Sequence, residues 1–143
     1  MSNPVHIEKV LYTATASASN REGKVTSSDG NLDVQLSLPK SLGGPGGNGT
    51  NPEQLFAGGY AACFGSALAF VAKSKGIKTG PVKITAKVDI GAVGQGFGLA
   101  AELTAEIPEL PREQAQALLE AAHQVCPYSN ATRGNIEVAL RLA

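Results

Sequence analysis

Residues 51–76 read NPEQLFAGGYAACFGSALAFVAKSKG, and this segment decides the fold. It predicts one long helix. Asn51 is a good N-cap, Pro52 suits the first helical position, and Glu53 is favourable in the positive first turn. Gly76 follows a basic last turn and is a typical helix stop.

The helix carries no charge from residue 55 to residue 72. That length approaches a membrane span, but the run is rich in Ala and Gly, and the flanking segments alternate as water-exposed strands do. Small side chains lower helix propensity and allow close approach of another element. We therefore expect a buried central helix, packed against the core or against its own copy in a dimer.

Strand patterns lie on both sides of this helix. Before it, residues 7–17, 24–28 and 32–38 predict three antiparallel strands, with Asp29-Gly30 as a hairpin turn. After it, the sequence alternates in three further segments, which are residues 82–90, 99–107 and 136–142.

A second, amphipathic helix is predicted between the last two strands, from Pro111 to Cys126. The turn GAVGQGFG, residues 91–98, joins the strands before it. The predicted fold is α+β, with antiparallel sheets packed on two main helices, in a single domain over residues 1–143.

Composition excludes several classes of protein. The chain has 143 residues, with 12 basic and 12 acidic side chains and no basic block, so nucleic acid is not an expected partner. The N-terminus shows no secretory signal, and we expect a cytoplasmic protein that does not enter membranes. The glycine-rich residues 43–50 lack the Lys-Ser/Thr of a phosphate-binding loop.

Metal and serine-nucleophile sites are not expected either. No serine lies in a G-x-S-x-G elbow, and no dinucleotide fingerprint follows a strand. A zinc site would need Cys63, Cys126, His6 and His123, which are scattered and show no paired spacing.

The two cysteines have different settings. Cys63 lies in the middle of the apolar helix, whereas Cys126 ends the amphipathic one, where the helix dipole disfavours an anion. This asymmetry suggests an attacking and a resolving thiol, although two ordinary buried cysteines would fit the composition. A buried Cys63 would need a cation nearby to become a thiolate.

Three stretches resemble the organic hydroperoxide resistance (Ohr) proteins of the wider Ohr/OsmC superfamily. They are NREGKV (20–25), LGGPGGNGTNPEQLFAGGYAACF (42–64) and CPYSNATRGN (126–135). The resemblance covers nearly the whole chain, and the residues after the second cysteine are similar to the Ohr branch. It implies an intertwined homodimer and a thiol-dependent peroxidase that reduces organic hydroperoxides to alcohols.

The resemblance also implies the site residues. Cys63 would be the reactive cysteine and Cys126 the resolving one, with Arg21 as the cation and Glu53 as the residue that orients it. Taken alone, Arg21 reads as a turn residue and Glu53 as a helix-dipole partner. Hydroperoxide would oxidise Cys63 to a sulfenic acid, which condenses with Cys126 to a disulfide.

Substrate and reductant are further expectations. An apolar pocket with Phe56, Tyr60 and Phe64 would favour hydroperoxides with apolar tails. The family suggests a dihydrolipoyl group on a protein, or a small dithiol, as the external reductant, with no bound cofactor. Two rival functions remain: a redox-sensing or regulatory dimer that uses the same cysteines without turnover, and a non-redox binding or structural protein.

Spacing raises a question of geometry. On one continuous helix, Glu53 and Cys63 are separated by about 15 Å along the axis. Either Arg21 bridges part of that gap, or the first turn is not helical, or Arg21 and Glu53 come from the partner subunit. We favour the last hypothesis, because the small residues of the helix indicate a close neighbour.

Overall fold

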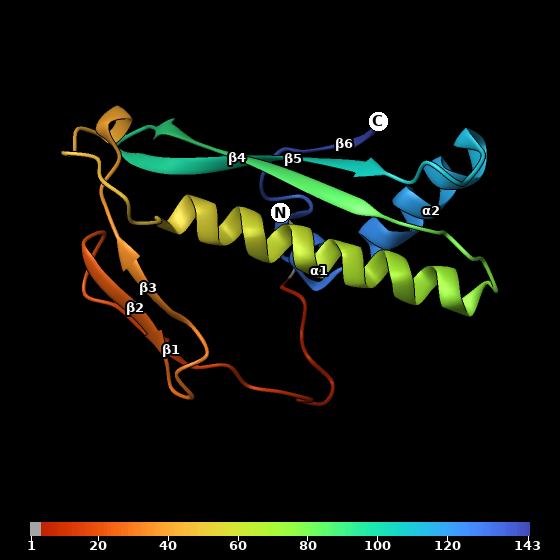
Figure 1. Ribbon diagram of the computed structural model, residues 1–143, viewed down its shortest axis with the longest axis horizontal. Coiled ribbons are helices and arrows are strands. Elements are labelled where there is room, and N and C mark those ends of the chain that lie inside the picture. The colour runs from red at the N-terminus through yellow and green to blue at the C-terminus, as the bar shows by residue number, and fades with distance from the viewer. Residues whose placement is uncertain (1–3) are drawn as a thin grey trace. The chain divides into compact units, whose positions relative to one another are not determined.

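The computed structural model describes residues 4–143, and the chain divides into two compact units. One unit is His6–Leu55, and the other contains Phe56–Ala143 together with Pro4 and Val5. Each unit has a sheet of its own, labelled in Figure 1. The α+β class is confirmed, whereas the single domain over residues 1–143 stays a prediction.

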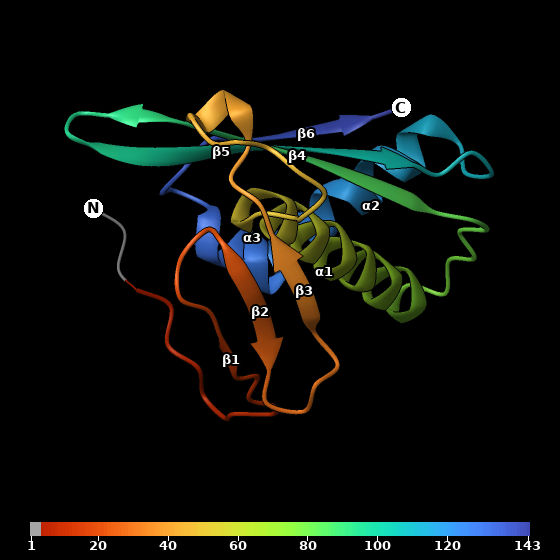
Figure 2. The same ribbon diagram turned by 60° about the vertical axis from the view of Figure 1, so that its left-hand side comes forward.

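The unit His6–Leu55 contains a small antiparallel sheet in the order β1, β2, β3, which Figure 2 shows face on. Its strands are β1 (Ala16–Ser17), β2 (Gly23–Ser27) and β3 (Asp33–Leu36), followed by a short 3-10 helix at Lys40–Leu42. The predicted hairpin turn is confirmed. Gly30 has a φ of 79°, which a residue without Cβ adopts at little cost.

The predicted strand over residues 7–17 is wrong for most of its length, since only Ala16–Ser17 pairs with β2. A strand forms only where its backbone groups find partners. The Thr15 carbonyl accepts from the Ser28 N–H at 2.9 Å, but residues 7–14 make no backbone hydrogen bond within the part of the chain that the structure describes. Their apolar side chains are left exposed, with Leu11 90% and Tyr12 80% accessible.

The sheet of the unit Phe56–Ala143 has the order β4, β5, β6. β4 (Lys83–Val93) and β5 (Gly96–Glu106) form a long antiparallel hairpin, and β6 (Val138–Leu142) pairs with β5 in parallel. The parallel pair follows from the helical crossover that precedes β6. The predicted turn over 91–98 is too long, because the ladder continues to Val93 and Gly96.

Helix α1 (Pro52–Ser74) confirms the prediction at both ends. The Asn51 side chain accepts a hydrogen bond from the Gln54 N–H at 2.8 Å, as an N-cap does. At the other end, Gly76 has a φ of 67° and the Ile77 N–H donates to the Ala72 carbonyl.

Helix α2 (Arg112–Val125) also matches its prediction, but a further short helix, α3 (Pro127–Thr132), follows at once. The sequence analysis ends the amphipathic helix at Cys126 and places no helix after it. Proline is equally suited to the first position of a new helix, so it ends α2 and begins α3. Cys126 is the residue between the two helices.

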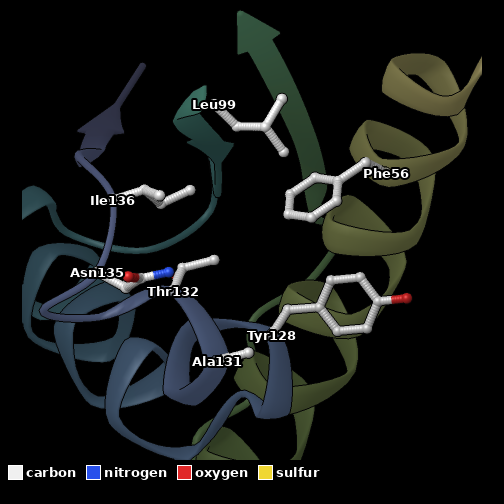
Figure 3. A pocket seen from close by; sticks show the side chains of 7 residues that line it. All are labelled: Phe56, Leu99, Tyr128, Ala131, Thr132, Asn135 and Ile136. Atoms are coloured by element: carbon white, nitrogen blue, oxygen red, sulfur yellow. The ribbon is translucent and has the colours of Figure 1, made fainter. Parts of the chain in front are cut away.

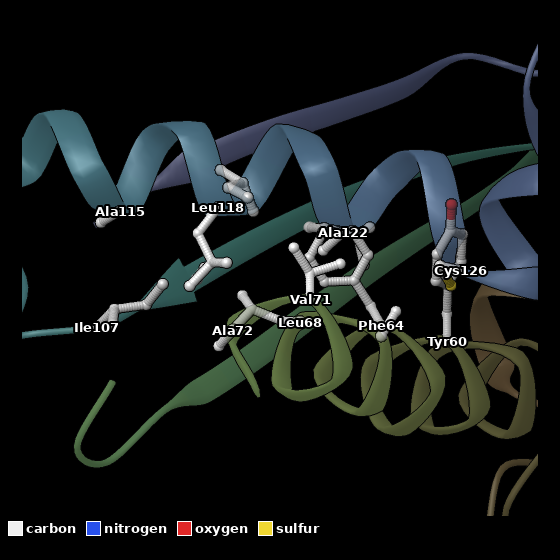
Figure 4. Close-up of a cluster of buried hydrophobic side chains, with 14 of the residues drawn as sticks. Tyr60, Phe64, Leu68, Val71, Ala72, Ile107, Ala115, Leu118, Ala122 and Cys126 are labelled. Atoms are coloured by element: carbon white, nitrogen blue, oxygen red, sulfur yellow. The ribbon is translucent and has the colours of Figure 1, made fainter. Parts of the chain in front are cut away.

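The core lies where α1 and α2 cover one face of the β4–β6 sheet (Figures 1 and 4). Its α1 members share one helix face; they are Tyr60, Phe64, Ala67, Leu68, Val71 and Ala72. The opposite face of α1 is exposed and consists mostly of small residues. By length and composition α1 could cross a membrane, yet one of its faces packs in the core of this unit.

Candidate active site

The two cysteines lie side by side. The Cys126 thiol points at the Cys63 sulfur, and the two Sγ atoms are 3.6 Å apart. A disulfide needs about 2.05 Å, so a small movement joins them. Cys126 is fully buried at the α2–α3 junction, whereas Cys63 on α1 is partly exposed. The geometry therefore offers one sulfur that a reagent can reach and a second sulfur behind it.

The surroundings of Cys63 do not favour a thiolate on their own. Burial raises the pKa of the Cys63 thiol, the backbone N–H of Tyr128 lowers it, and the neighbouring Cys126 raises it again. Since burial is the largest of these effects, the thiol needs a positive charge close by to ionise near neutral pH.

Alkylation should distinguish the two sulfurs. We expect iodoacetamide to modify Cys63 at least about tenfold faster than Cys126 in the reduced native protein, because accessibility controls thiol reactivity. Peptide mass spectrometry over a time course measures both rates, and the same reaction in denaturant is the control, where the rates should converge. Equal native rates would contradict the division of roles.

The other predicted site residues also form a pair. Arg21 lies between β1 and β2, and Glu53 lies in the first turn of α1, both within the unit His6–Leu55. Arg21 Nη1 donates to Glu53 Oε1 at 2.6 Å, and Nη2 donates to Oε2 at 2.9 Å. This two-pronged contact holds the guanidinium in a fixed orientation.

Both groups of this pair are charged over a wide pH range. The hydrogen bond from Arg21 holds the pKa of Glu53 below its usual range, and the same contact raises the pKa of Arg21. The carboxylate side chain is 16% exposed and the guanidinium 33%, so part of the positive charge still faces outward. The pair is neutral as a whole, but its guanidinium is a cationic group in a fixed orientation, and its outward-facing part can bind a further acceptor.

The structure thus pairs Cys63 with Cys126 and Arg21 with Glu53, one pair in each unit. It also removes one of the three geometric alternatives, because α1 is helical from Pro52 onward, with Glu53 in its first turn. The idea that the first turn is not helical is wrong.

An apolar cavity of about 400 Å³ lies in the unit Phe56–Ala143. Figure 3 shows Phe56 and Leu99 facing Ile136 and Thr132 across it. The lining is mostly carbon, with Thr132 and Asn135 as polar residues, whereas the Tyr128 hydroxyl points away from the other lining side chains. The residues that line it are Phe56, Leu99, Tyr128, Ala131, Thr132, Asn135 and Ile136.

Of the three predicted pocket aromatics, Phe56 lines this cavity. Tyr60 and Phe64 are fully buried in the core instead. Tyr60 supports the cavity wall from behind, with its ring centroid 6.1 Å from that of Phe56 and 5.7 Å from that of Tyr128. The sequence interpretation missed Tyr128, although it lies in the CPYSNATRGN stretch directly after the second cysteine.

Among residues 4–143, no three His, Cys, Asp or Glu side chains cluster in a way that could hold a metal ion. His123 lies on α2 and contacts the Ser129 hydroxyl, with Nδ1 and Oγ 2.8 Å apart. His123 is therefore hydrogen-bonded to a buried hydroxyl and is not placed to bind a metal with other ligands among the described residues.

The fold and the paired cysteines define a class of protein. Residues 44–141 match the sequence model of the OsmC-like protein family. The chain belongs to this family, and within it to the branch of organic hydroperoxide resistance proteins.

Relatives from several bacteria support this assignment. The organic hydroperoxide resistance protein of Xanthomonas axonopodis pv. citri is 56% identical, over 95% of this chain and 97% of that protein. The crystal structure of such a protein from Elizabethkingia anophelis is 55% identical, with a TM-score of 0.89 and coverage of 94% and 98%. That of OhrB from Bacillus subtilis is 44% identical, with a TM-score of 0.84 and coverage of 94% and 100%.

Proposed function

We propose that this protein is an antioxidant enzyme, a cysteine-based peroxidase that reduces organic hydroperoxides to alcohols. The observation that supports it best is the 3.6 Å contact between a reachable Cys63 and a buried Cys126. The names of the relatives point to the same chemistry, since they are organic hydroperoxide resistance proteins.

The reaction balances with two thiols. The Cys63 thiolate attacks the outer oxygen of ROOH, the O–O bond breaks, and the alkoxide takes a proton to leave as ROH. Cys63 is now a sulfenic acid. The Cys126 sulfur attacks it, the S–O bond breaks, water leaves, and a Cys63–Cys126 disulfide remains. An external dithiol then reduces the disulfide by thiol exchange, so no bound cofactor is needed.

Arg21 is the proposed source of the positive charge that ionises Cys63. Its guanidinium stays protonated at all working pH values, and Glu53 holds its orientation. The same charge would stabilise the negative charge on the oxygens as the O–O bond breaks.

A homodimer is part of the proposal. Both units expose large apolar side chains that a second copy would cover, with Ile7 77%, Leu11 90% and Phe97 79% accessible. Residues 7–14, which make no backbone hydrogen bond within the described chain, have strand-forming character, and the small-residue face of α1 permits close approach. Light scattering at several protein concentrations tests this part.

The apolar cavity next to Tyr128 is the proposed site for the organic tail. Carbon-lined walls favour an alkyl or aryl group, whereas hydrogen peroxide gains nothing from them. The proposed reductant is a dihydrolipoyl group or a small dithiol, in the cytoplasm.

The test is turnover of cumene hydroperoxide in the presence of excess dithiol. We expect continuous consumption over many equivalents, with preference over hydrogen peroxide. A redox sensor would consume about one equivalent and stop, and a non-redox binding protein would consume none. Either of these results would overturn the proposed function.

The close approach of Gly59 to Tyr128 gives a test of the pocket. A Cβ at Gly59 would lie 2.8 Å from the Tyr128 hydroxyl, whereas a Cβ at Gly58 would meet nothing within 4 Å. We expect Gly59→Ala to displace the Tyr128 ring and lower kcat/KM for bulky cumene hydroperoxide more than for tert-butyl hydroperoxide. Steady-state kinetics measure the ratio, with Gly58→Ala as the matched control. An unchanged ratio would remove Tyr128 from the substrate site.

A further inference from the structure

A buried cluster of polar side chains connects the three helices of the unit Phe56–Ala143. The Tyr60 hydroxyl on α1 contacts the Ser129 hydroxyl at 2.8 Å and the Thr132 hydroxyl at 3.0 Å, both on α3. The Ser129 hydroxyl also contacts Nδ1 of His123 on α2 at 2.8 Å. Tyr60, Ser129, Thr132 and His123 are called the hydroxyl cluster below.

The hydroxyls of the cluster are buried and hydrogen-bonded. Tyr60 and Ser129 are completely buried and Thr132 is 5% exposed. No buried side-chain nitrogen or oxygen in the described residues lacks a hydrogen-bond partner. Buried polar groups placed in this way fix one arrangement of the elements that carry them, because every alternative leaves a donor or acceptor unpaired.

The bonds of the cluster can run in either direction. Burial and the charge of Arg133 lower the pKa of His123, so its ring is neutral near pH 7 and Nδ1 either accepts or donates. Each hydroxyl has one proton, so the three side-chain contacts that link Thr132, Tyr60, Ser129 and His123 can run in either direction. When the order runs from His123 toward Thr132, the Thr132 proton is also free to donate to the Ser129 carbonyl, at 3.3 Å. The contacts therefore persist in both tautomers.

The cluster lies one turn from each cysteine. Tyr60 precedes Cys63 by three residues on α1, and Ser129 follows Cys126 by three residues through the start of α3. The Tyr60–Ser129 bond therefore joins the same two chain segments whose sulfurs must meet. The backbone of Cys126 is held on its two sides, where its N–H donates to the Ala122 carbonyl and its carbonyl accepts from the Asn130 N–H.

We propose that the hydroxyl cluster positions the resolving cysteine: it holds the start of α3 against α1, so that Cys126 stays within reach of the Cys63 sulfenic acid. This role rests on the proposed function, since it serves the step in which the S–O bond of the sulfenic acid breaks, water leaves and the disulfide forms. Of the cluster, only Thr132 also lines the cavity proposed for the organic tail, so Tyr60 and Ser129 do not touch the hydroperoxide in its first attack. Loss of the cluster should slow the second step and spare the first.

Single-turnover trapping separates the two steps. Reduced wild type, Tyr60→Phe and Ser129→Ala each receive one equivalent of cumene hydroperoxide without dithiol, and then dimedone, which captures sulfenic acid. Mass spectrometry gives the ratio of trapped Cys63 to Cys63–Cys126 disulfide. We expect this ratio to rise about tenfold in both variants, which corresponds to about 1.4 kcal/mol in the second step, while peroxide loss keeps its wild-type rate.

The controls address folding and coupling. Ser74→Ala removes a hydroxyl hydrogen bond to the Val71 carbonyl from the far end of α1 and should leave the ratio unchanged. His123→Ala acts at the partly exposed end of the cluster and should reproduce the effect in a milder form. The double variant Tyr60→Phe/Ser129→Ala should lose less than the two single variants added together, because the Tyr60–Ser129 bond is removed in both.

An equilibrium measurement keeps the inference separate from the peroxidase proposal. The stability of the Cys63–Cys126 disulfide is measured against dithiothreitol after oxidation with diamide, and it should fall about tenfold in Tyr60→Phe and Ser129→Ala. Unchanged trapping and an unchanged disulfide equilibrium would overturn the positioning role. If the wild-type protein does not react with the hydroperoxide, the proposed function is wrong. The disulfide equilibrium then still tests whether the cluster positions Cys126.

Discussion

Cys63→Ser is expected to abolish hydroperoxide turnover, with a loss of at least about 10³-fold in kcat/KM. A serine hydroxyl is a far weaker nucleophile than a thiolate at neutral pH and cannot form a sulfenic acid. A coupled assay with excess dithiol and cumene hydroperoxide measures the loss. Because oxygen and sulfur differ little in size, Cys63→Ser should unfold near the wild-type temperature.

Cys126→Ser should behave differently. Its Cys63 is still oxidised by the first equivalent of hydroperoxide, but no disulfide follows and the sulfenic acid persists or advances to sulfinic acid. We expect one fast turnover and then rapid inactivation by excess peroxide. If Cys126→Ser and Cys63→Ser instead share one phenotype, with no first turnover in either, the assignment of Cys63 as the attacking sulfur is wrong.

The helices and most strands follow from local chemistry, which explains why the sequence predicts them. The ends of a helix leave backbone N–H and C=O groups without partners, and only a few residue types suit these positions. In α1 they are Asn51 as the N-cap, Pro52 at the first position and Gly76 after the last turn. Likewise, the alternating residues of β4 and β5 must place one apolar set on the helices. Such signals are contained in a few neighbouring residues.

The errors have nonlocal causes. Residues 7–14 have strand propensity but no backbone partner within the described chain, and α3 depends on Pro127 acting as a start as well as a stop. Tyr60 and Phe64 are close to the reactive cysteine in sequence, yet both lie on the face of α1 that is buried in the core. Which face of α1 meets the cavity is decided by packing, and the α1 sequence, apolar all round, does not reveal it.

The site could be predicted in part. The contrast between the two cysteines suggested their roles, but their 3.6 Å separation depends on how α2 ends against α1. Arg21 and Glu53 are 32 positions apart and were named only through the family resemblance. No periodicity marks either residue, because an ion pair between a loop and a helix leaves no pattern in the sequence.

Removal of the positive charge should be the second large effect. An adjacent cation shifts a pKa by about 1–3 units, so Arg21→Ala should lower the thiolate fraction of Cys63 and the rate of its oxidation by about ten- to a thousandfold. Arg21→Lys keeps the charge but loses the two-pronged contact, and its loss should be intermediate. Single-turnover oxidation of Cys63 measures the effect. Lys24→Ala is the matched control, since it breaks the exposed ion pair with Asp33 in the same unit.

The pH dependence of Cys63 alkylation shows in which direction Arg21 shifts the pKa of the thiol. Loss of the guanidinium leaves the thiolate less stable, so the thiol holds its proton more tightly and its pKa rises. Burial already raises the pKa of Cys63, and without Arg21 the alkylation midpoint should lie above the ordinary value of about 8.5. In the wild type we expect a midpoint below that value. Equal midpoints in wild type and Arg21→Ala would show that another group ionises Cys63.

Subunit mixing decides whether Glu53 and Arg21 act on their own Cys63 or on that of the partner. Glu53→Ala retains Cys63, and Cys63→Ser retains the intact ion pair, so neither homodimer should be active. If the pair acts across the dimer, a mixed dimer contains one complete site, in which the cysteine of the first subunit meets the ion pair of the second. Co-refolding the two variants should then restore activity toward half of the wild-type value per mixed dimer. If the pair acts within one chain, every Cys63 in the mixture still lacks Glu53, and the mixture stays as inactive as its parents.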